Sequence, residues 1–221
     1  MALIIKLWLI RSGIHPHPGP KNSGLLSLVT YNCRGLRDNA KLKRLLVKLN
    51  KLIENNHIIA LQETHNIDNR IFKLFWKHSY IRNCTMSNKR GVILLFHNEF
   101  KINKVQLDIE KRYIIADIEN PTTNLLIGNV YYPNVIKEAV EFSETFYLRF
   151  MELQYENPSA MCVIMGDMNV CFGKEDHLNR VLRVGEDKLS RVIALNKESC
   201  ELTDSYRILH KSGGFTWNRG N

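Results

Sequence analysis

Short apolar runs, each followed at once by a polar cluster, constrain the fold of this chain more than any other feature. The runs span residues 25–30, 58–61 and 162–165. They are too short for buried helices and rich in branched side chains, so we predict that each is a buried β-strand. If these strands end at the same edge of a sheet, the polar residues that follow them will lie close together.

The polar clusters supply two carboxylates and two amides. They lie in Thr-Tyr-Asn-Cys-Arg-Gly (30–35), Leu-Gln-Glu-Thr (61–64) and Gly-Asp-Met-Asn (166–169), and the candidate site residues are Asn32, Glu63, Asp167 and Asn169. Carboxylate oxygens suit a hard divalent cation, and amide donors suit a phosphodiester. The clusters together therefore predict a metal-dependent nuclease.

Each cluster taken alone has an ordinary structural interpretation. Glu63 fits a solvated strand end, Asn32 before Gly35 fits a turn, and residues 166–169 fit an Asx-stabilised turn. The combination favours a site, because every cluster follows a predicted strand.

Periodicity along the rest of the chain predicts alternating strands and helices in one domain, residues 23–221. We expect strands at Leu25–Asn32, Ile58–Gln62, Val92–His97, Tyr113–Glu119, Leu125–Tyr131 and Met161–Gly166, and helices at Asn39–Asn55, Glu138–Glu156 and Asp187–Glu201.

The net charge of +9 is concentrated near the amino terminus. Residues 1–56 contain ten Lys or Arg and two acidic residues, which suits contact with a phosphate backbone. Arg34 and Arg37 are the candidate nucleic-acid contacts, because they lie in the loop beside Asn32. Four other cations have helical spacing, and for them a solvated helix face is the favoured interpretation: Lys41, Arg44, Lys48 and Lys51.

The five cysteines show no paired spacing. Cys162 lies within an apolar run and Cys33 just after one, so buried thiols are favoured over disulfides or zinc ligands. This predicts a reducing compartment, either the cytosol or the nucleus.

We interpret residues 1–22 as a leader outside the folded domain. Residues 2–10 are apolar but too short to cross a bilayer, and residues 13–20 contain three prolines. We expect a disordered leader and no membrane association.

Six motifs, in order, carry a family resemblance. They are Val-Thr-Tyr-Asn-Cys-Arg-Gly-Leu (29–36), Leu-Gln-Glu-Thr-His (61–65), Arg-Gly-Val-Ile-Leu-Leu (90–95), Asn-Val-Tyr-Tyr-Pro-Asn (129–134), Gly-Asp-Met-Asn (166–169) and Gly-Phe-Thr-Trp (214–217). From about Leu25 to its last residue the chain resembles the endonuclease/exonuclease/phosphatase superfamily, and within it the apurinic-type endonuclease domain of non-LTR (LINE-like) retrotransposons. The resemblance implies an α+β fold: two packed β-sheets flanked by helices, a four-layer α/β/β/α sandwich, with the active site at one edge.

The resemblance and the chemistry together suggest a role for each candidate residue. Glu63 would hold Mg²⁺, with Mn²⁺ as an alternative, and Asp167 would orient or deprotonate the attacking water. Asn169 would donate to a phosphate oxygen, and Asn32 would support Glu63 or the metal's water shell. The resemblance assigns Tyr131 to stabilisation of the transition state, although packing is the ordinary role of a strand tyrosine.

The resemblance also predicts segments that this sequence lacks after residue 217. In the family, a Ser-Arg-Ile-Asp strand and a final Ser-Asp-His supply a further Asp and the catalytic His, and His210 does not match that place. We therefore expect a C-terminally truncated copy, missing the last strands, with impaired activity. Residues 13–20 resemble a ribosome-skipping peptide, but Gly13 and His17 replace its Asp and Asn.

Several functional interpretations stay open at this point. The first is a DNA-nicking endonuclease, acting as a monomer or as part of a larger polyprotein with a reverse transcriptase. The second is a catalytically dead nucleic-acid-binding remnant of such an enzyme. The third is a phosphatase of small phosphoesters.

Overall fold

A computed structural model describes residues 7–9, 26–54, 57–172, 183–205 and 208 of the chain. The chain divides into two compact units. The first, which we call the sheet unit, comprises Met1–Tyr131 and Ser159–Asp167; the second, the helix unit, comprises Tyr132–Pro158 and Met168–Asn221.

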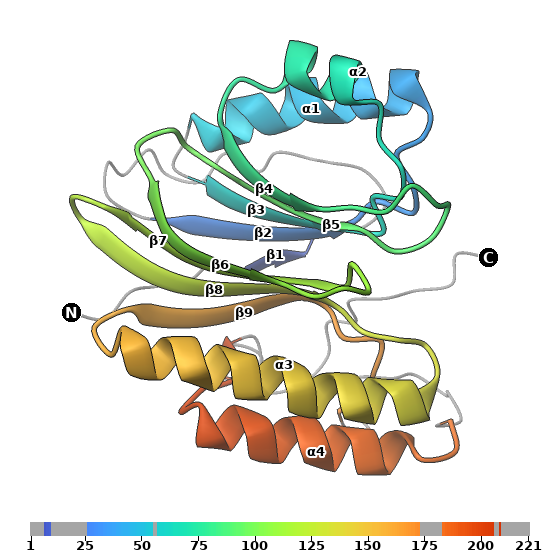
Figure 1. The fold of residues 1–221 in the computed structure, drawn as a ribbon, viewed down its shortest axis with the longest axis vertical. Coiled ribbons are helices and arrows are strands. Elements are labelled where there is room, and N and C mark those ends of the chain that lie inside the picture. Colours follow the sequence, from blue (N-terminus) through green and yellow to red (C-terminus); the bar gives the residue numbers. More distant parts are fainter. Residues whose placement is uncertain (1–6, 10–25, 55–56, 173–182, 206–207, 209–221) are drawn as a thin grey trace. The chain divides into compact units, whose positions relative to one another are not determined.

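The sheet unit contains two mixed β-sheets (Figure 1). The first has the order β1-β2-β3-β5-β4, and its strands are β1 (Leu7–Leu9), β2 (Ser27–Asn32), β3 (His57–Gln62), β5 (Val92–Phe96) and β4 (Ser79–Asn83). The second has the order β6-β7-β8-β9, and its strands are β6 (Lys101–Leu107), β7 (Tyr113–Asn120), β8 (Thr123–Tyr131) and β9 (Met161–Asp167). The pairs β1–β2, β2–β3 and β8–β9 are parallel, and the other neighbouring pairs are antiparallel.

The two sheets pack face to face around a shared apolar core. Ile58 and Leu94 from the first sheet and Ile114 and Ile127 from the second are all fully buried in one cluster. Full burial of one such side chain contributes about 1.5–3 kcal/mol. The alternation of side chains along each strand leaves the opposite face of the first sheet to be covered separately.

Helices α1 (Asn39–Ile53) and α2 (Asn69–Phe75) cover that opposite face (Figure 1). The buried residues of α1 recur at helical spacing and pack with Phe72 of α2 against the sheet. Both helices begin at an aspartate N-cap: Asp38 accepts from the backbone N–H of Lys41, and Asp68 accepts from that of Ile71.

In its described residues the helix unit contains two long helices that pack against each other, α3 (Ile136–Glu156) and α4 (Glu186–Ser199). The buried hydroxyl of Ser143 on α3 accepts from Tyr132 Oη and from Asn196 Nδ2 of α4, both at 3.3 Å. This buried polar contact fixes how the two apolar helix faces meet.

The predicted fold class, two packed sheets with flanking helices, is confirmed. Every predicted strand and helix exists, and no boundary differs from its predicted position by more than two residues. The sequence analysis missed α2, β4 and β6, because α2 and β4 are short and β6 exposes most of its side chains.

Part of the predicted leader is a strand, since Leu7–Leu9 form β1 and pair with Leu28–Thr30 of β2. That residues 1–22 form a leader stays a prediction. The other leader residues, His210 and the motif at 214–217 lie outside the described residues. That residues 23–221 act as one domain stays a prediction. No helix in the described part of the chain is long and apolar enough to span a membrane.

Candidate active site

Three of the predicted site residues meet at one edge of the sheet unit. The Asn32 side-chain amide donates to Glu63 Oε1 at 2.7 Å and to Asp167 Oδ2 at 2.8 Å. A single amide group thus joins two carboxylates that come from opposite sheets.

Strand pairing explains this convergence. Asn32 lies beside Gln62 in the parallel β2–β3 pair, so both strands end at the same edge and Glu63 follows at once. Asp167 lies beside Tyr131 in the parallel β8–β9 pair, which ends at the corresponding edge of the second sheet. The stacking of the two sheets then brings these strand ends together.

The orientation of Asn32 is set by its own loop. The backbone N–H of Arg34 donates to Asn32 Oδ1 at 3.0 Å, which turns the amide hydrogens toward the carboxylates. Asn32 therefore meets Glu63 and Asp167 as a donor, as expected for a residue that supports metal ligands without itself being one.

Glu63 has a left-handed backbone, with φ of 49°. A non-glycine residue in this region costs of order 1–3 kcal/mol, and such strain often occurs at functional sites. The backbone compensates through hydrogen bonds on both sides, from Gly35 N to Glu63 O at 2.7 Å and from Thr64 N to Gly91 O at 3.0 Å.

Tyr131 completes the group of side chains at this edge. Burial, the neighbouring charge of Glu63 and a hydrogen bond to the Glu63 carboxylate raise the pKa of Tyr131 to about 12. The guanidinium carbon of Arg112 lies 5.5 Å from the centre of the Tyr131 ring. The phenol therefore stays protonated at physiological pH and can act as a hydrogen-bond donor.

The donor set fits a magnesium-type ion. Two carboxylates held close together repel each other, and a divalent cation between them relieves that repulsion. Mg²⁺ commonly takes one or two protein carboxylates and keeps several waters. No group of three or more His, Cys, Asp and Glu side chains suited to a metal occurs in the described part of the chain. Glu63 is the candidate ligand, and the Asn32 amide joins its carboxylate to that of Asp167.

Asn169 belongs to the helix unit, where its amide has a different contact. Asn169 Nδ2 donates to the Tyr132 carbonyl at 2.9 Å, and the Arg183 guanidinium donates to the Asn169 carbonyl. Chain connectivity keeps its Cα within about 7 Å of that of Asp167. Its role as a phosphate donor stays a prediction.

The loop after β2 carries both predicted nucleic-acid contacts, Arg34 and Arg37, and both are exposed. Lys41 departs from the solvated-face interpretation, because its Nζ donates to the carbonyls of Cys33 at 2.7 Å and Gly35 at 2.8 Å. Lys41 thus fixes the shape of the loop that presents the two arginines.

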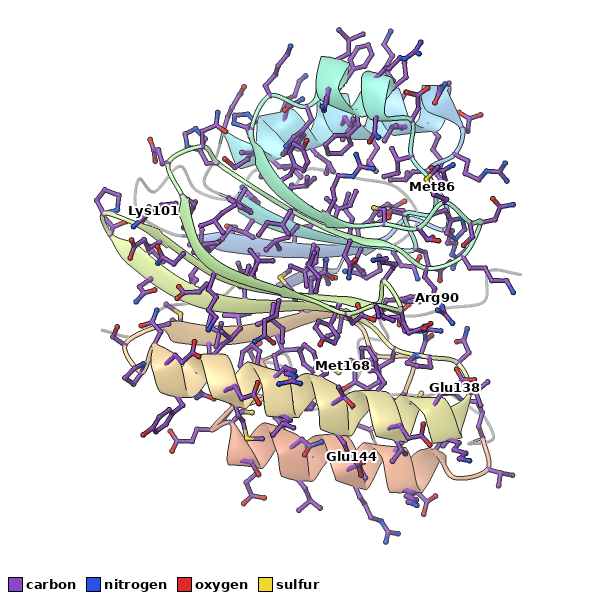
Figure 2. All side chains as sticks on the ribbon, in the orientation of Figure 1. Met86, Arg90, Lys101, Glu138, Glu144 and Met168 are labelled. Carbon is purple, nitrogen blue, oxygen red and sulfur yellow. The ribbon has the colours of Figure 1, made fainter. Side chains whose placement is uncertain are left out.

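The loops that carry His65 and Arg90 lie at the same end of the sheet unit as Glu63. The backbone N–H of His65 donates to the carbonyl of Arg90 at 2.9 Å, and Figure 2 shows Arg90 at one end of the unit and Lys101 at the other. A Cβ on Gly35 would lie 2.6 Å from His65 Nδ1, so the imidazole packs directly on that glycine.

Sequence reasoning missed a chain of buried polar side chains beneath the candidate site. Gln62 Nε2 donates to Asn129 Oδ1 at 2.8 Å, and Thr30 Oγ1 donates to Gln62 Oε1 at 3.2 Å. The available signal was a polar residue within an otherwise apolar strand, which marks a buried hydrogen bond but not its partner.

A comparison with protein families gives a match over most of the chain. The model of the Endonuclease/Exonuclease/phosphatase family matches residues 29–220.

Several solved structures have a similar fold. The AP endonuclease LMAP from Leishmania major is 15% identical, with a TM-score of 0.65 over 85% of this chain and 70% of that chain. The 3'-5' exonuclease NExo from Neisseria meningitidis is 19% identical, with a TM-score of 0.58 over 85% and 76%. TDP2 from Caenorhabditis elegans is 15% identical, with a TM-score of 0.50 over 70% of this chain and 50% of that chain. The match spans 46–64% of the length of three C. elegans TDP2 structures.

Proposed function

The chain belongs to the endonuclease/exonuclease/phosphatase family, and from that premise we propose that it is a divalent-metal-dependent phosphodiesterase that nicks DNA, of the type encoded by non-LTR (LINE-like) retrotransposons. The observation that carries the proposal is the Asn32 amide bridging Glu63 and Asp167. A site of two carboxylates with a neutral donor is suited to binding a cation and activating water.

Each side chain has a distinct task in this proposal. A bound Mg²⁺, or Mn²⁺ in its place, supplies positive charge against the developing charge on the phosphate. Glu63 holds the ion, and Asp167 accepts a proton from the attacking water. Tyr131 donates from its protonated phenol to a phosphate or leaving oxygen. Asn32 keeps the two carboxylates at a fixed separation.

DNA is the proposed partner because exposed cations lie next to these carboxylates. Arg34 and Arg37 would contact backbone phosphates, and Asn169 would donate to a non-bridging oxygen of the cleaved one. All five cysteines lie in the described residues and none forms a disulfide, which supports the proposal of a reducing compartment, the cytosol or the nucleus. A reverse transcriptase in the same polyprotein is part of the proposed origin.

The test is a supercoiled-plasmid nicking assay with Mg²⁺, Mn²⁺ or chelator, comparing the wild-type chain with Asp167→Asn. We expect metal-dependent nicking by the wild type and a loss of at least about 100-fold in Asp167→Asn, with DNA affinity by fluorescence anisotropy within twofold. The control is Glu119→Gln, because Glu119 is an exposed carboxylate that pairs with Lys101 at the opposite end of the sheet unit.

Three outcomes would contradict the proposal in different ways. DNA binding without cutting by the wild type would favour the catalytically dead remnant. Hydrolysis of a small phosphoester that DNA does not inhibit would favour the phosphatase. Full turnover by Asp167→Asn would remove Asp167 from the mechanism.

A further inference from the structure

Two fully buried amides link the two sheets of the sheet unit. Gln62 of β3 is 1% exposed and Asn129 of β8 is 0% exposed, and their side chains hydrogen bond at 2.8 Å. A buried amide without its partners costs about 1–3 kcal/mol. Apolar side chains would fill the same volume without this cost, so the two amides have a role other than packing.

Asn129 binds the first sheet at the end of a strand ladder. Its Nδ2 donates to the carbonyls of Ile93 at 2.8 Å and Leu61 at 3.2 Å. Leu61 and Ile93 face each other as the last described pair of the β3–β5 ladder. Asn129 thus holds β3 at the point from which the chain continues to Glu63.

The register of the strands connects this contact to the candidate active site. Side chains two residues apart on a strand point to the same face, so Asn129 and Tyr131 both project from β8 toward the first sheet. Asn129 binds at residues 61 and 62, and two positions further along the phenol of Tyr131 donates to Glu63. Asp167 lies beside Tyr131 on β9.

We propose that the Gln62–Asn129 amide pair is a positioning device that sets how far β3 lies along β8, and thereby places Glu63 against Tyr131 and Asp167. These residues touch neither substrate nor metal in this proposal, which rests on the proposed function. An apolar pair of similar volume would fill the space but would let the strands slide or separate. A shift of about 1 Å in a catalytic group can cost about 100-fold in rate.

The test compares Asn129→Leu with the same substitution at Asn50. Asn50 on α1 also donates its side-chain amide to a backbone carbonyl, that of Phe75, at 2.7 Å, but it lies in the outer helical layer. Both variants are assayed at least 15 °C below their own Tm. We expect Asn129→Leu to lose at least about tenfold in turnover at saturating DNA and to need more metal for half-maximal rate, with DNA affinity within twofold. We expect Asn50→Leu to keep its turnover and metal requirement.

A second variant keeps the test decisive if Asn129→Leu does not fold. Gln62→Met removes the side-chain hydrogen bond between Gln62 and Asn129 but leaves the bonds of Asn129 to the carbonyls of Leu61 and Ile93. We expect it to fold and to lose about threefold in turnover, with the metal requirement again raised. Full turnover with an unchanged metal requirement in either folded variant would overturn the proposal, and so would an equal loss in Asn50→Leu.

A readout that does not depend on activity separates this inference from the proposed function. The Asn32 side-chain amide protons donate to Glu63 and Asp167, so their NMR resonances report the placement of both carboxylates. We expect these resonances to move in Asn129→Leu and Gln62→Met and to stay in Asn50→Leu. If the wild-type chain cuts no DNA, the proposed function fails, and unmoved Asn32 resonances would independently refute the positioning role.

Discussion

Carboxylates in the two units of this protein have contrasting partners. Glu186 in the helix unit is fully buried and accepts hydrogen bonds from the backbone N–H groups of Arg183 at 2.9 Å and Cys171 at 3.1 Å. The Arg183 guanidinium adds an ion pair at 3.2 Å. Burial alone would raise the pKa of Glu186, but these hydrogen bonds and the charge of Arg183 outweigh it and lower the pKa.

Glu63 and Asp167 in the sheet unit share a neutral donor. The Asn32 amide donates to both carboxylates, and the Tyr131 phenol donates to Glu63. A carboxylate paired with a guanidinium stabilises the fold, whereas the neutral Asn32 amide and Tyr131 phenol leave the negative charge of Glu63 available to a cation from solution. The comparison predicts that removing the charge of Glu63 lowers activity but not stability, and that removing the charge of Glu186 lowers stability but not the affinity for metal.

The largest expected effect is that of Glu63→Gln on catalysis. Removal of one of the two negative charges should lower turnover by about 100-fold at fixed Mg²⁺ and raise the metal concentration for half-maximal rate by at least tenfold. Because the same change relieves repulsion with Asp167, the free energy of unfolding without metal should not fall. Metal titrations of nicking and urea unfolding check both parts. A variant with lower stability and normal metal dependence would make Glu63 structural.

Glu186→Gln should show the reverse pattern. The neutral side chain leaves Arg183 without its charged partner, and we expect the free energy of unfolding at pH 7 to fall by about 1–3 kcal/mol. Arg183 also donates to the carbonyl of Asn169, a candidate site residue, so turnover is not a clean control for this variant. The control is the metal concentration for half-maximal rate, which should not change. An unchanged urea midpoint would show that this ion pair contributes no stability.

The pH dependence of that loss has a definite sign. The folded-state pKa of Glu186 is lowered from its ordinary value of 4.5, so its stabilisation is present above pH 4.5 and disappears as the pH falls through the folded-state pKa. The stability difference between wild type and Glu186→Gln should therefore narrow below pH 4.5. A difference that stays constant down to the acid transition would contradict the charged interaction.

Bound Mg²⁺ should stabilise the fold through Glu63 and not through Glu186. At a Mg²⁺ concentration ten times its Kd, the wild type should gain about 1.4 kcal/mol of unfolding free energy. Glu63→Gln should lose most of this gain and Glu186→Gln should keep it. Thermal unfolding with and without Mg²⁺ measures the effect, and an equal gain in all three proteins would place the ion elsewhere.

The convergence of Asn32, Glu63 and Asp167 was predictable because local patterns identify strand ends, and parallel neighbours end at a common edge. What each buried polar residue faces across the sheets was not predictable. Asn129 interrupts an apolar strand, and no spacing within that strand indicates contacts with Leu61 and Ile93. A pattern within one element does not report the neighbouring element.

Other missed features have the same physical origin. Helical periodicity assigned Lys41 to the polar face of α1 correctly, but it carried no information on the preceding loop, whose carbonyls bind the Lys41 ammonium. Glu186 resembles an ordinary acidic residue in the first turn of a helix, and only the fold brings Arg183 and Cys171 around it. Edge strand β6 exposes most of its side chains, so its sequence lacks an apolar pattern.

Among the changes at these two carboxylate sites, Tyr131→Phe should have the smallest effect, because it removes a neutral donor from Glu63 and leaves both charges in place. Loss of one hydrogen bond worth about 1 kcal/mol predicts about a fivefold fall in turnover. Because the pKa of Tyr131 is raised to about 12, the phenol stays protonated from pH 7 to 10, and the ratio of wild-type to variant rates should be constant over that range. Rate–pH profiles of the two proteins measure that ratio. A ratio that declines toward one above pH 8 would mean that the phenol ionises there. The donors around Glu63 would then not all be neutral, and their neutrality would no longer distinguish this site from the Glu186–Arg183 pair.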